Sequence, residues 1–278
     1  MARNDPTALR WLVGVELAHY RKQAGLTLKE AAAKSGIGRA KLGHMETSKY
    51  IQWPADVATL MLTYGAPPHD VDRLSTLAGT AGGRSWVAPW SNVVPDWFRT
   101  FVGLEGLAES EFVFGPLQLP GLLQTAAYAE AVTSATGFVR QDHSDRFVSF
   151  RLARAKRLND DDPLDLHAVI AEGALRLAVG DAETRRGQLK HLLTLAKRPN
   201  VTIQVVRPED GPHAANTGHL VVLDFPQAQS IAYAERVDGG VYIQDPDDVR
   251  TYKMAVENLK SVALSPAKSL SLIKGLID

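Results

Sequence analysis

The first eighty residues repeat apolar side chains with the period of an α-helix, and this pattern predicts five helices. Glycine closes three of them, at Gly25, Gly36 and Gly65, and Pro54 opens the fourth at a favoured first-turn position. We therefore expect a compact all-α domain over residues 1–80. The expected helices cover residues 9–23, 28–35, 38–46, 54–65 and 69–78.

Residues 26–46 are the most informative segment, because they predict two short helices joined by a tight turn. Thr27 and Glu30 have the spacing of a capping box at the start of the first helix. Gly36 ends that helix, and Ile37 is expected as an apolar plug in the turn. The segment therefore predicts a helix-turn-helix.

The second helix of the pair starts near Gly38 and carries basic and polar side chains along one side. Burial of Leu42 and Met45 would leave that side facing solvent. A DNA major groove admits a short helix of this kind. We therefore predict duplex DNA as a ligand, with exposed contacts from Arg39, Lys41 and His44.

The chemistry of each side chain suggests what it would contact. Arg39 can pair with O6 and N7 of a guanine, which is worth roughly 1–3 kcal/mol of discrimination. His44 can donate to or accept from a base edge or a phosphate, and Lys41, a flexible point charge, is expected on phosphate. Further phosphate contacts are expected beside the two helices, from Thr27 at a helix N-terminus and from Ser48 and Lys49.

Glycine, serine and proline interrupt the helical pattern between residues 79 and 95 and mark a boundary. We divide the chain into a helix-turn-helix domain (1–80), a linker (81–96) and a C-terminal domain (97–278). Trp86 and Trp90 are expected to anchor the linker on the second domain.

From residue 97 the pattern alternates between helix and strand, and after residue 200 it becomes rich in strands. The fold class is therefore an all-α five-helix domain followed by a larger mixed α/β (α+β) domain. Helices are expected at 97–109, after Gly121, and at 146–158, 181–197 and 247–262. Strands are expected at 111–117 and 164–171 and in the runs VTIQVV, HLVVLDF, SIAYAE and GVYIQ.

Composition narrows the class of protein. A chain of 278 residues with 45% hydrophobic and 22% charged residues can bury a real core, and its length suggests two domains. The absence of cysteine excludes disulfides and thiolate zinc sites and fits a reducing cytoplasm. Nothing resembles a signal peptide, and no run approaches the roughly 18 apolar residues of a membrane span.

Net charge is zero, but it is unevenly spread. Residues 1–80 carry ten Lys or Arg against seven Asp or Glu, and the remainder carries 21 against 24. The excess of +3 agrees with an N-terminal nucleic-acid reader.

Two segments of the C-terminal domain could hold an effector or a partner. PLQLPGLLQT (116–125) could be only a turn into a buried helix, or a recognition surface that uses Gln118 and Gln124. The basic run of residues 146–157 is expected to be a solvated or acid-paired helix face, with Asp160 to Asp162 as partners. The alternative is an anion or DNA contact through this run, which contains Arg146, Arg151, Arg154, Lys156 and Arg157.

The loop of residues 209–219 gathers side chains that could be mistaken for a catalytic or metal centre, namely Glu209, Asp210, His213, Asn216 and His219. The spacings match no zincin motif, and the chain has no GxSxG or P-loop. We interpret the loop as a polar turn or as the rim of an effector pocket that includes His213. No catalytic residue, metal or cofactor is expected.

Residues 21–49, RKQAGLTLKEAAAKSGIGRAKLGHMETSK, resemble the xenobiotic-response-element family of repressors, which includes phage Cro and repressor proteins. The apolar–Glu pair that closes the family's recognition helix is present as Met45 and Glu46, and Glu46 is interpreted as structural. Leu28 stands where the family usually has a glutamine that contacts phosphate. The resemblance implies base readers at Arg39, Ala40 and His44.

The C-terminal domain resembles the second domain of the WhiJ-like proteins, a large group of actinomycete regulators. The resemblance implies a transcriptional regulator of development or specialised metabolism with a link to small BldB-like companion proteins. It supplies no ligand. The match is carried by WFRTFVGLE (97–105), PLQLPGLLQTAAYAEA (116–131), EGALR (172–176), QLKHLLTLAKRPNVTIQVV (188–206) and ALSPAKSLSLI (263–273).

These observations predict a cytoplasmic, homodimeric DNA-binding transcriptional regulator. Its C-terminal domain would sense a small-molecule effector or a companion protein. An antitoxin-like protein that sequesters a small partner and regulates its own operon is the alternative. An enzyme that uses His213 and His219 is a third class, which the missing motifs disfavour.

Overall fold

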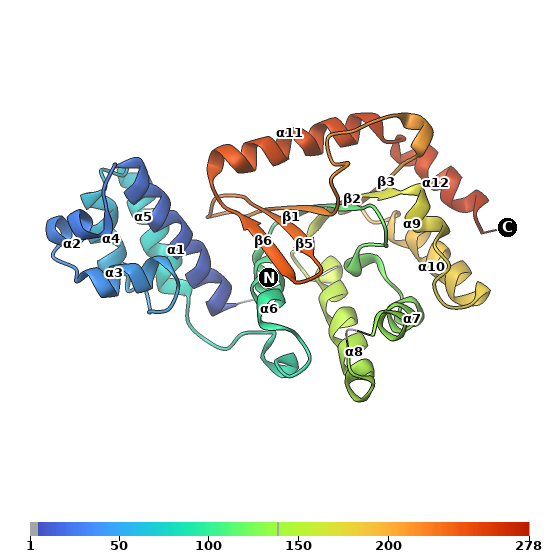
Figure 1. Cartoon of the computed structure of the whole chain (residues 1–278), viewed down its shortest axis with the longest axis horizontal. Coiled ribbons are helices and arrows are strands. Elements are labelled where there is room, and N and C mark those ends of the chain that lie inside the picture. The colour runs from blue at the N-terminus through green and yellow to red at the C-terminus, as the bar shows by residue number, and fades with distance from the viewer. Residues whose placement is uncertain (1–4, 138, 278) are drawn as a thin grey trace.

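A computed structural model describes residues 5–137 and 139–277, which form a small helical domain and a larger α/β domain (Figure 1). All five helices expected in the first domain are confirmed. Their bounds are α1 Pro6–Gln23, α2 Leu28–Ser35, α3 Arg39–Glu46, α4 Pro54–Thr63 and α5 Pro68–Thr80.

Local signals in the sequence explain where these helices begin and end. The Asp5 side chain accepts hydrogen bonds from the first free N–H groups of α1, and Thr27 and Glu30 form the expected capping box of α2. Gly36 ends α2 with a φ of 72°, a left-handed conformation that favours glycine. Ile37 is buried in the turn, as the pattern predicted.

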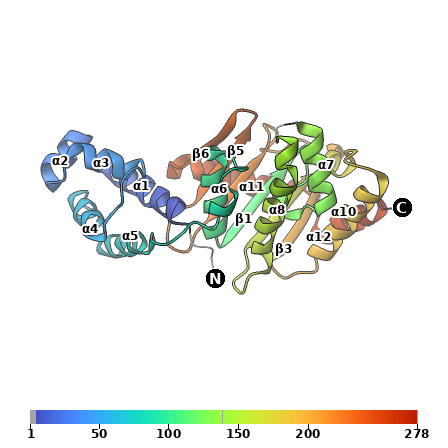
Figure 2. The same ribbon diagram turned by 90° about the horizontal axis from the view of Figure 1, so that it is seen from below.

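Helix α1 belongs to two hydrophobic cores at once. Val13 and Leu17 pack into the core of the helical domain, whereas Ala8 and Leu12 pack into the core of the α/β domain. Figures 1 and 2 show α1 extending from the small domain toward the large one. At the crossing with α6 (Asp96–Leu107), a Cβ on Gly103 would lie 2.9 Å from the Cβ of Ala8. The two domains therefore share one rigid helix.

The α/β domain is built on a six-stranded sheet with the strand order β3-β2-β1-β4-β5-β6. β1, β2 and β3 are parallel, and β2 and β3 lie in that order on one side of β1. β4 lies on the other side of β1 and pairs antiparallel with it. β5 and β6 complete the sheet as an antiparallel hairpin. The strands are β1 Ser110–Gly115, β2 Asp165–Ala171, β3 Val201–Val206, β4 Leu220–Asp224, β5 Ile231–Arg236 and β6 Gly239–Ile243.

Helices cover both faces of the sheet. Side chains alternate along β1, so Val113 packs toward α6, α7 and α8, whereas Phe112 and Phe114 pack toward α11. Figure 2 shows α6, α7 and α8 side by side on one face. The long helices of this domain that follow α6 are α7 Ala126–Thr136, α8 Ser144–Ala155, α10 Ala182–Leu195, α11 Pro246–Val262 and α12 Pro266–Gly275.

The fold class is confirmed, and the strand runs read from the sequence all form strands. One helix starts later than expected, because a 3₁₀ turn at Gly121–Leu123 precedes α7. Thr125 caps the N-terminus of α7, and its hydroxyl oxygen accepts a hydrogen bond from the Tyr128 N–H. The sequence pattern did not predict the short α9 (Glu172–Arg176) or α12. None of the described helices is long and apolar enough to cross a membrane.

The linker tryptophans dock on the α/β domain, as expected. The rings of Trp86 and Trp90 lie 6.4 and 5.9 Å from the ring of Phe150 in α8. The 3₁₀ turn Ala88–Trp90 brings the two indoles together on that ring.

Candidate nucleic-acid interface

Helix α3 presents a row of unengaged side chains to solvent. Arg39, its first residue, is exposed, and so are Ala40 and His44. Leu42 and Met45 are fully buried on the opposite side and fix the helix on the core. Neither Arg39 nor His44 uses its side chain in a hydrogen bond or ion pair with another described residue. Both side chains are therefore free to contact a ligand.

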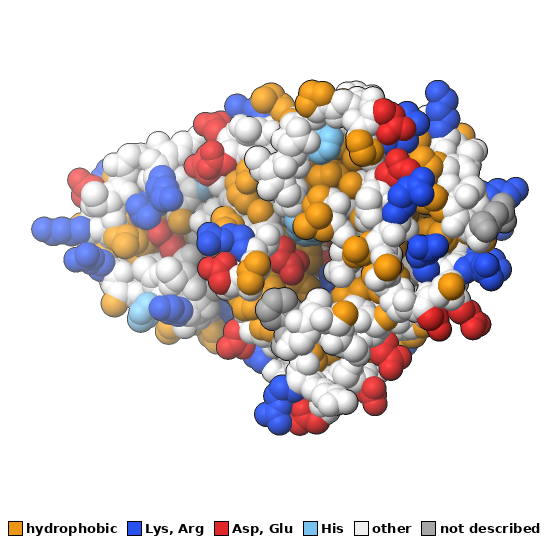
Figure 3. Space-filling view, turned by 45° about the vertical axis from the view of Figure 1, so that its right-hand side comes forward, with side chains coloured by type: hydrophobic (Ala, Val, Ile, Leu, Met, Phe, Trp, Pro, Cys, Tyr) orange, Lys and Arg blue, Asp and Glu red, His pale blue; other side chains and the backbone are white. Residues whose placement is uncertain are grey.

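Lysine and arginine side chains gather at the end of the molecule that the helical domain forms, on the left of Figure 3. Most acidic side chains of this domain have partners within the protein. One caps a helix and the others form ion pairs with its own cations: Asp5, Glu16, Glu46, Asp56 and Asp70. The exposed surface is thus more basic than the domain's formal charge, with cations at Lys22, Lys29, Lys34, Arg39 and Lys49.

Lys41 is less available than the sequence suggested. Its Nζ lies 2.6 Å from Asp56 Oδ2 in the first turn of α4 and 5.7 Å from the ring centre of Tyr50. The side chain is partly buried. A phosphate would have to compete with Asp56, which the sequence could not reveal because the two helices meet only in the fold.

Thr27 and Ser48 also have protein partners for their hydroxyl groups. Thr27 Oγ1 donates to Glu30 Oε2 at 2.7 Å, and the same carboxylate accepts the Thr27 N–H at 2.9 Å. Ser48, with a φ of 60°, donates to the carbonyl oxygen of Arg10 in α1. Both residues therefore shape the helix-turn-helix. Lys49 beside Ser48 is exposed and remains a candidate phosphate contact.

The C-terminal end of α3 is clamped to α1. Glu46 accepts two hydrogen bonds from Arg21, with Nε and Nη2 at 2.6 and 2.8 Å, which confirms its structural role. A Cβ on Gly14 would lie 2.8 Å from the carbonyl oxygens of Met45 and Glu46, so only glycine fits there. The sequence signal for this contact was a lone glycine inside a helical pattern. Any shift of α1 would therefore reach the DNA-facing helix.

Two family models match separate parts of the chain. The family described as a helix-turn-helix domain matches residues 12–74, and the one described as "Domain of unknown function (DUF5753)" matches residues 98–275. The second match spans more than half of the chain. The chain belongs to the DUF5753 family. No curated protein and no solved structure matches it.

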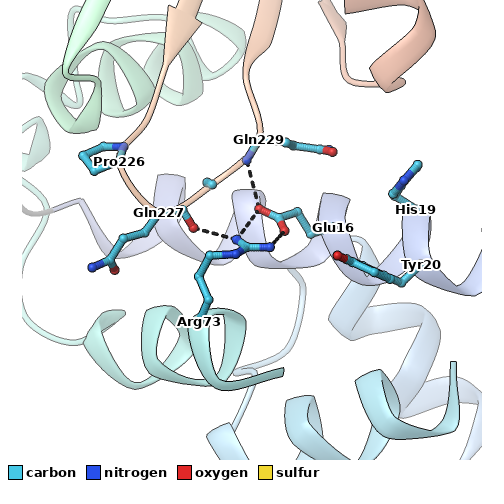
Figure 4. Close-up of a pocket in the computed structure, with 8 residues that line it drawn as sticks. Glu16, His19, Tyr20, Arg73, Pro226, Gln227 and Gln229 are labelled. Carbon is cyan, nitrogen blue, oxygen red and sulfur yellow. Dashed lines mark hydrogen bonds and ion pairs between the residues drawn. The ribbon is translucent and has the colours of Figure 1, made fainter. Parts of the chain in front are cut away.

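The helix-turn-helix domain and the DUF5753 domain also meet around a buried carboxylate. Glu16 of α1 accepts hydrogen bonds from Arg73 Nη2 at 2.6 Å and from the Gln229 N–H at 3.1 Å (Figure 4). Arg73 in addition donates to the carbonyl oxygen of Gln227 and to Asp70. Glu16, Arg73, Gln227 and Gln229 line an open pocket of about 320 Å³ between α1, α5 and the β4–β5 connection.

Three of the expected effector residues lie together in the DUF5753 domain. Arg151 Nη1 donates to Gln124 Oε1 at 2.6 Å, and Gln124 Nε2 donates to the carbonyl oxygen of Leu119. Arg154 stands one turn after Arg151 on α8, and a Cβ on Gly121 would lie 3.4 Å from its Nη1.

The basic run of residues 146–157 is partly solvated and partly acid-paired, as expected: Arg146 and Lys156 are exposed, whereas Arg154 and Arg157 are buried in ion pairs. Arg154 is buried and pairs with Glu105 of α6, with Nε and Nη2 at 3.1 and 2.5 Å from its oxygens. Arg157 is buried too and donates to the carbonyl oxygen of Ala108. Of the expected partners only Asp160, 3.9 Å from Arg157, forms an ion pair with the run. Helical periodicity could not foresee these partners, because α6 reaches α8 only through the tertiary fold.

The other two expected effector residues lie elsewhere. His213 sits edge-on against Phe114, 5.2 Å between ring centres, on the α11 side of the sheet. Gln118 is partly exposed in the turn after β1 and makes no side-chain hydrogen bond with a described residue. Among the described residues, no group of three or more His, Asp or Glu side chains is arranged to hold a metal ion.

Proposed function

We propose that the chain is a DNA-binding transcriptional regulator in which the DUF5753 domain controls how α3 meets DNA. The double role of α1 carries this proposal. One side of α1 packs into the DUF5753 core, and its Gly14 and Arg21 hold the end of α3. A signal changes DNA affinity only if it binds the competent and incompetent states unequally. A helix shared by both domains is a physical route for that difference.

Phosphate contacts from the exposed cations, Lys49 among them, would supply much of the affinity and make it fall with salt. Arg39, free at the start of α3, would add sequence choice. His44 lies one turn further on and would contact a base or a phosphate.

The test begins with selection of binding sites from fragmented genomic DNA, followed by fluorescence anisotropy on the selected site and on a scrambled duplex. R39A should lose about 1–3 kcal/mol on the selected site and lose its preference at one base pair per half-site. K197A, which removes an exposed charge from the DUF5753 domain, is the matched control and should change neither. Equal losses on both duplexes for R39A would remove Arg39 as a base reader.

We also propose that the protein binds DNA as a homodimer, with half-sites about 34–36 Å apart or at multiples of that spacing. The exposed apolar side chains of Tyr50, Ile51 and Trp53, which follow α3, support this proposal, because an apolar patch of this kind is often covered by a partner. Sedimentation of the free protein and of its complex with the selected site would measure the stoichiometry.

The signal would be either a small-molecule effector or a small companion protein. The WhiJ-like resemblance supports a BldB-like companion protein and, with it, the antitoxin-like alternative. Leu117 and Val237 support it too, because they are 80% and 90% exposed and follow β1 and β5 at the same edge of the sheet. Co-purification from native lysate, followed by mass spectrometry of proteins and small molecules, would separate the two signals. We propose no catalytic activity, and turnover lost in an H213A/H219A double variant would contradict that.

A further inference from the structure

Charged and aromatic side chains from three elements meet on the face of the DUF5753 sheet that α6, α7 and α8 cover. Phe101 of α6 links them, because its ring stacks on Tyr233 of β5 at 4.4 Å and lies 5.8 Å from the Arg154 guanidinium. Glu235 follows Tyr233 by two residues and so stands on the same face. Arg151 precedes Arg154 by one helical turn. The cluster lies beside the junction of β1 and β4, where strand growth reverses, a usual place for ligands in open sheets.

The cluster opens to solvent through a hollow. Glu235 is exposed and Arg151 and His219 are partly exposed, yet burial raises the pKa of Glu235 and lowers the pKa values of Arg151 and His219 to about 10 and about 4. Protein atoms therefore crowd these three side chains although water still reaches them. Figure 3 shows a hollow near the middle of the molecule, with acidic, histidine and apolar side chains in and around it.

One buried polar atom of the cluster, the Tyr233 hydroxyl, has no hydrogen-bond partner among the described residues, and on β1 the same holds for Glu111 Oε2. Tyr233 is fully buried and Glu111 is 4% exposed. The Tyr233 hydroxyl lies over Gly240, directly across from Glu235, where a Cβ would come within 2.4 Å of the hydroxyl oxygen. Buried polar atoms normally find partners, so the Tyr233 hydroxyl is left to donate to a group from outside the described chain.

The charges of the cluster indicate an anion. Arg154 donates from Nε and Nη2 to the Glu105 carboxylate. Its Nη1, beside Gly121, has no partner among the described residues. Arg151 donates only to the neutral Gln124, so its charge has no contacting carboxylate. Glu111 cannot neutralise it, because burial and the neighbouring Glu105 raise its pKa well above the usual value.

We propose that this hollow binds a small organic carboxylate, which Arg151 and Arg154 Nη1 hold while the Tyr233 hydroxyl donates a hydrogen bond to it. The planar guanidinium fork matches a carboxylate. Arg151 is the guanidinium of the cluster with no carboxylate of a described residue in contact, which suits a monoanion, whereas the charges of Glu105 and Glu235 would repel a phosphate dianion. Apolar side chains around the opening suit an aromatic or alkyl body.

The role of this ligand as a signal that acts on α3 rests on the proposed function. Its site touches α6, which packs on α1 at Gly103. It also touches β5, and Gln229, two residues before β5 begins, donates its N–H to Glu16 of α1. Binding to the full-length protein without DNA tests the site by itself, so failure of DNA binding would leave that result standing.

The experiment is ligand-observed NMR on the full chain with benzoate, phenylacetate and hexanoate, with benzamide and inorganic phosphate as matched probes. At least one carboxylate should bind, benzamide and phosphate should not, and R151M should raise the Kd at least tenfold. K156M, which removes an exposed cation from the end of the same helix, should leave the Kd unchanged. Circular dichroism and the Tm check that both variants fold.

Several outcomes would overturn the proposal. These are binding of none of the three carboxylates, equal binding of benzamide, binding of phosphate in their place, and an unchanged Kd in folded R151M. If R151M fails to fold, Y233F replaces it. Loss of the donor should then weaken carboxylate binding at least threefold, and an unchanged Kd would count against the site.

Discussion

Glu16 and Gln229 are 213 positions apart in the chain, yet the Gln229 N–H donates to Glu16 Oε1 at 3.1 Å. The same carboxylate holds Arg73 of α5 at 2.6 Å. One buried acid in α1 therefore ties the helix-turn-helix domain to the connection between β4 and β5. Its neighbours in sequence gave no hint of either partner.

E16Q should destabilise the protein by about 3 kcal/mol, because a buried pair that loses one charge leaves the other uncompensated. Asp70 still contacts Arg73 and will hold the loss near the lower end of the usual range. Urea unfolding followed by circular dichroism measures it. D72N, an exposed carboxylate on α5, is the control and should change stability by less than about 0.5 kcal/mol. Similar values for the two variants would show that the junction contributes little.

G14A should push α3 away from α1, because the added Cβ would lie 2.8 Å from two backbone carbonyl oxygens. We expect a loss of about 1–3 kcal/mol in unfolding free energy, as for other overpacked positions, and a loss of DNA affinity. G79A places its Cβ at an ordinary 3.5 Å from Pro54 and should be neutral or stabilising by up to about 1 kcal/mol. Wild-type affinity in G14A would show that α3 does not depend on this contact.

K49A should weaken binding to every DNA sequence alike and reduce the slope of log K against log salt by about one. Lys49 is exposed and forms no ion pair with a described residue, whereas Lys41 is already paired with Asp56, so K41A should change the slope less. Anisotropy titrations between 50 and 200 mM salt compare the two variants. A larger change of slope in K41A would reverse this assignment.

Stability should fall as the pH drops from 7 to 5, in part because of His219. Burial lowers its folded pKa to about 4, with a smaller effect from Arg154, so the unfolded chain takes up a proton first. A histidine held neutral in this way costs about 2 kcal/mol of stability at pH 5. H219N should remove that part of the pH dependence of the urea midpoint, while H44N, at an exposed position, should not. The same pH slope in H219N and wild type would mean that His219 is not held neutral.

Much of the fold follows from signals within a few residues of one another. The capping box of Thr27, the left-handed Gly36 and the alternation along the strands all act locally, and each matched the structure. The exposure of Arg39 and the burial of Leu42 were predictable for the same reason, because a helix has a fixed period.

The site in the DUF5753 domain could be foreseen only in part. Gln124, Arg151 and Arg154 lie within 31 positions and meet through a short helical hairpin, whereas Glu105 and Tyr233 come from distant elements. His213 was expected to serve the same kind of site because of its polar loop. In the structure it packs edge-on against Phe114, on the α11 face of the sheet. A one-residue change of phase moves a side chain across the sheet.

The sequence by itself determined the helix-turn-helix, the order of the strands and of all the longer helices except α12, and the excess of positive charge in the first eighty residues. Period, caps and charge are local properties of a chain. The tertiary structure decided which charges stay free. It paired Lys41 with Asp56, buried Arg154 against Glu105 and placed α1 in two cores. Those outcomes depend on which elements pack together, and packing is a property of the whole chain that no single segment carries.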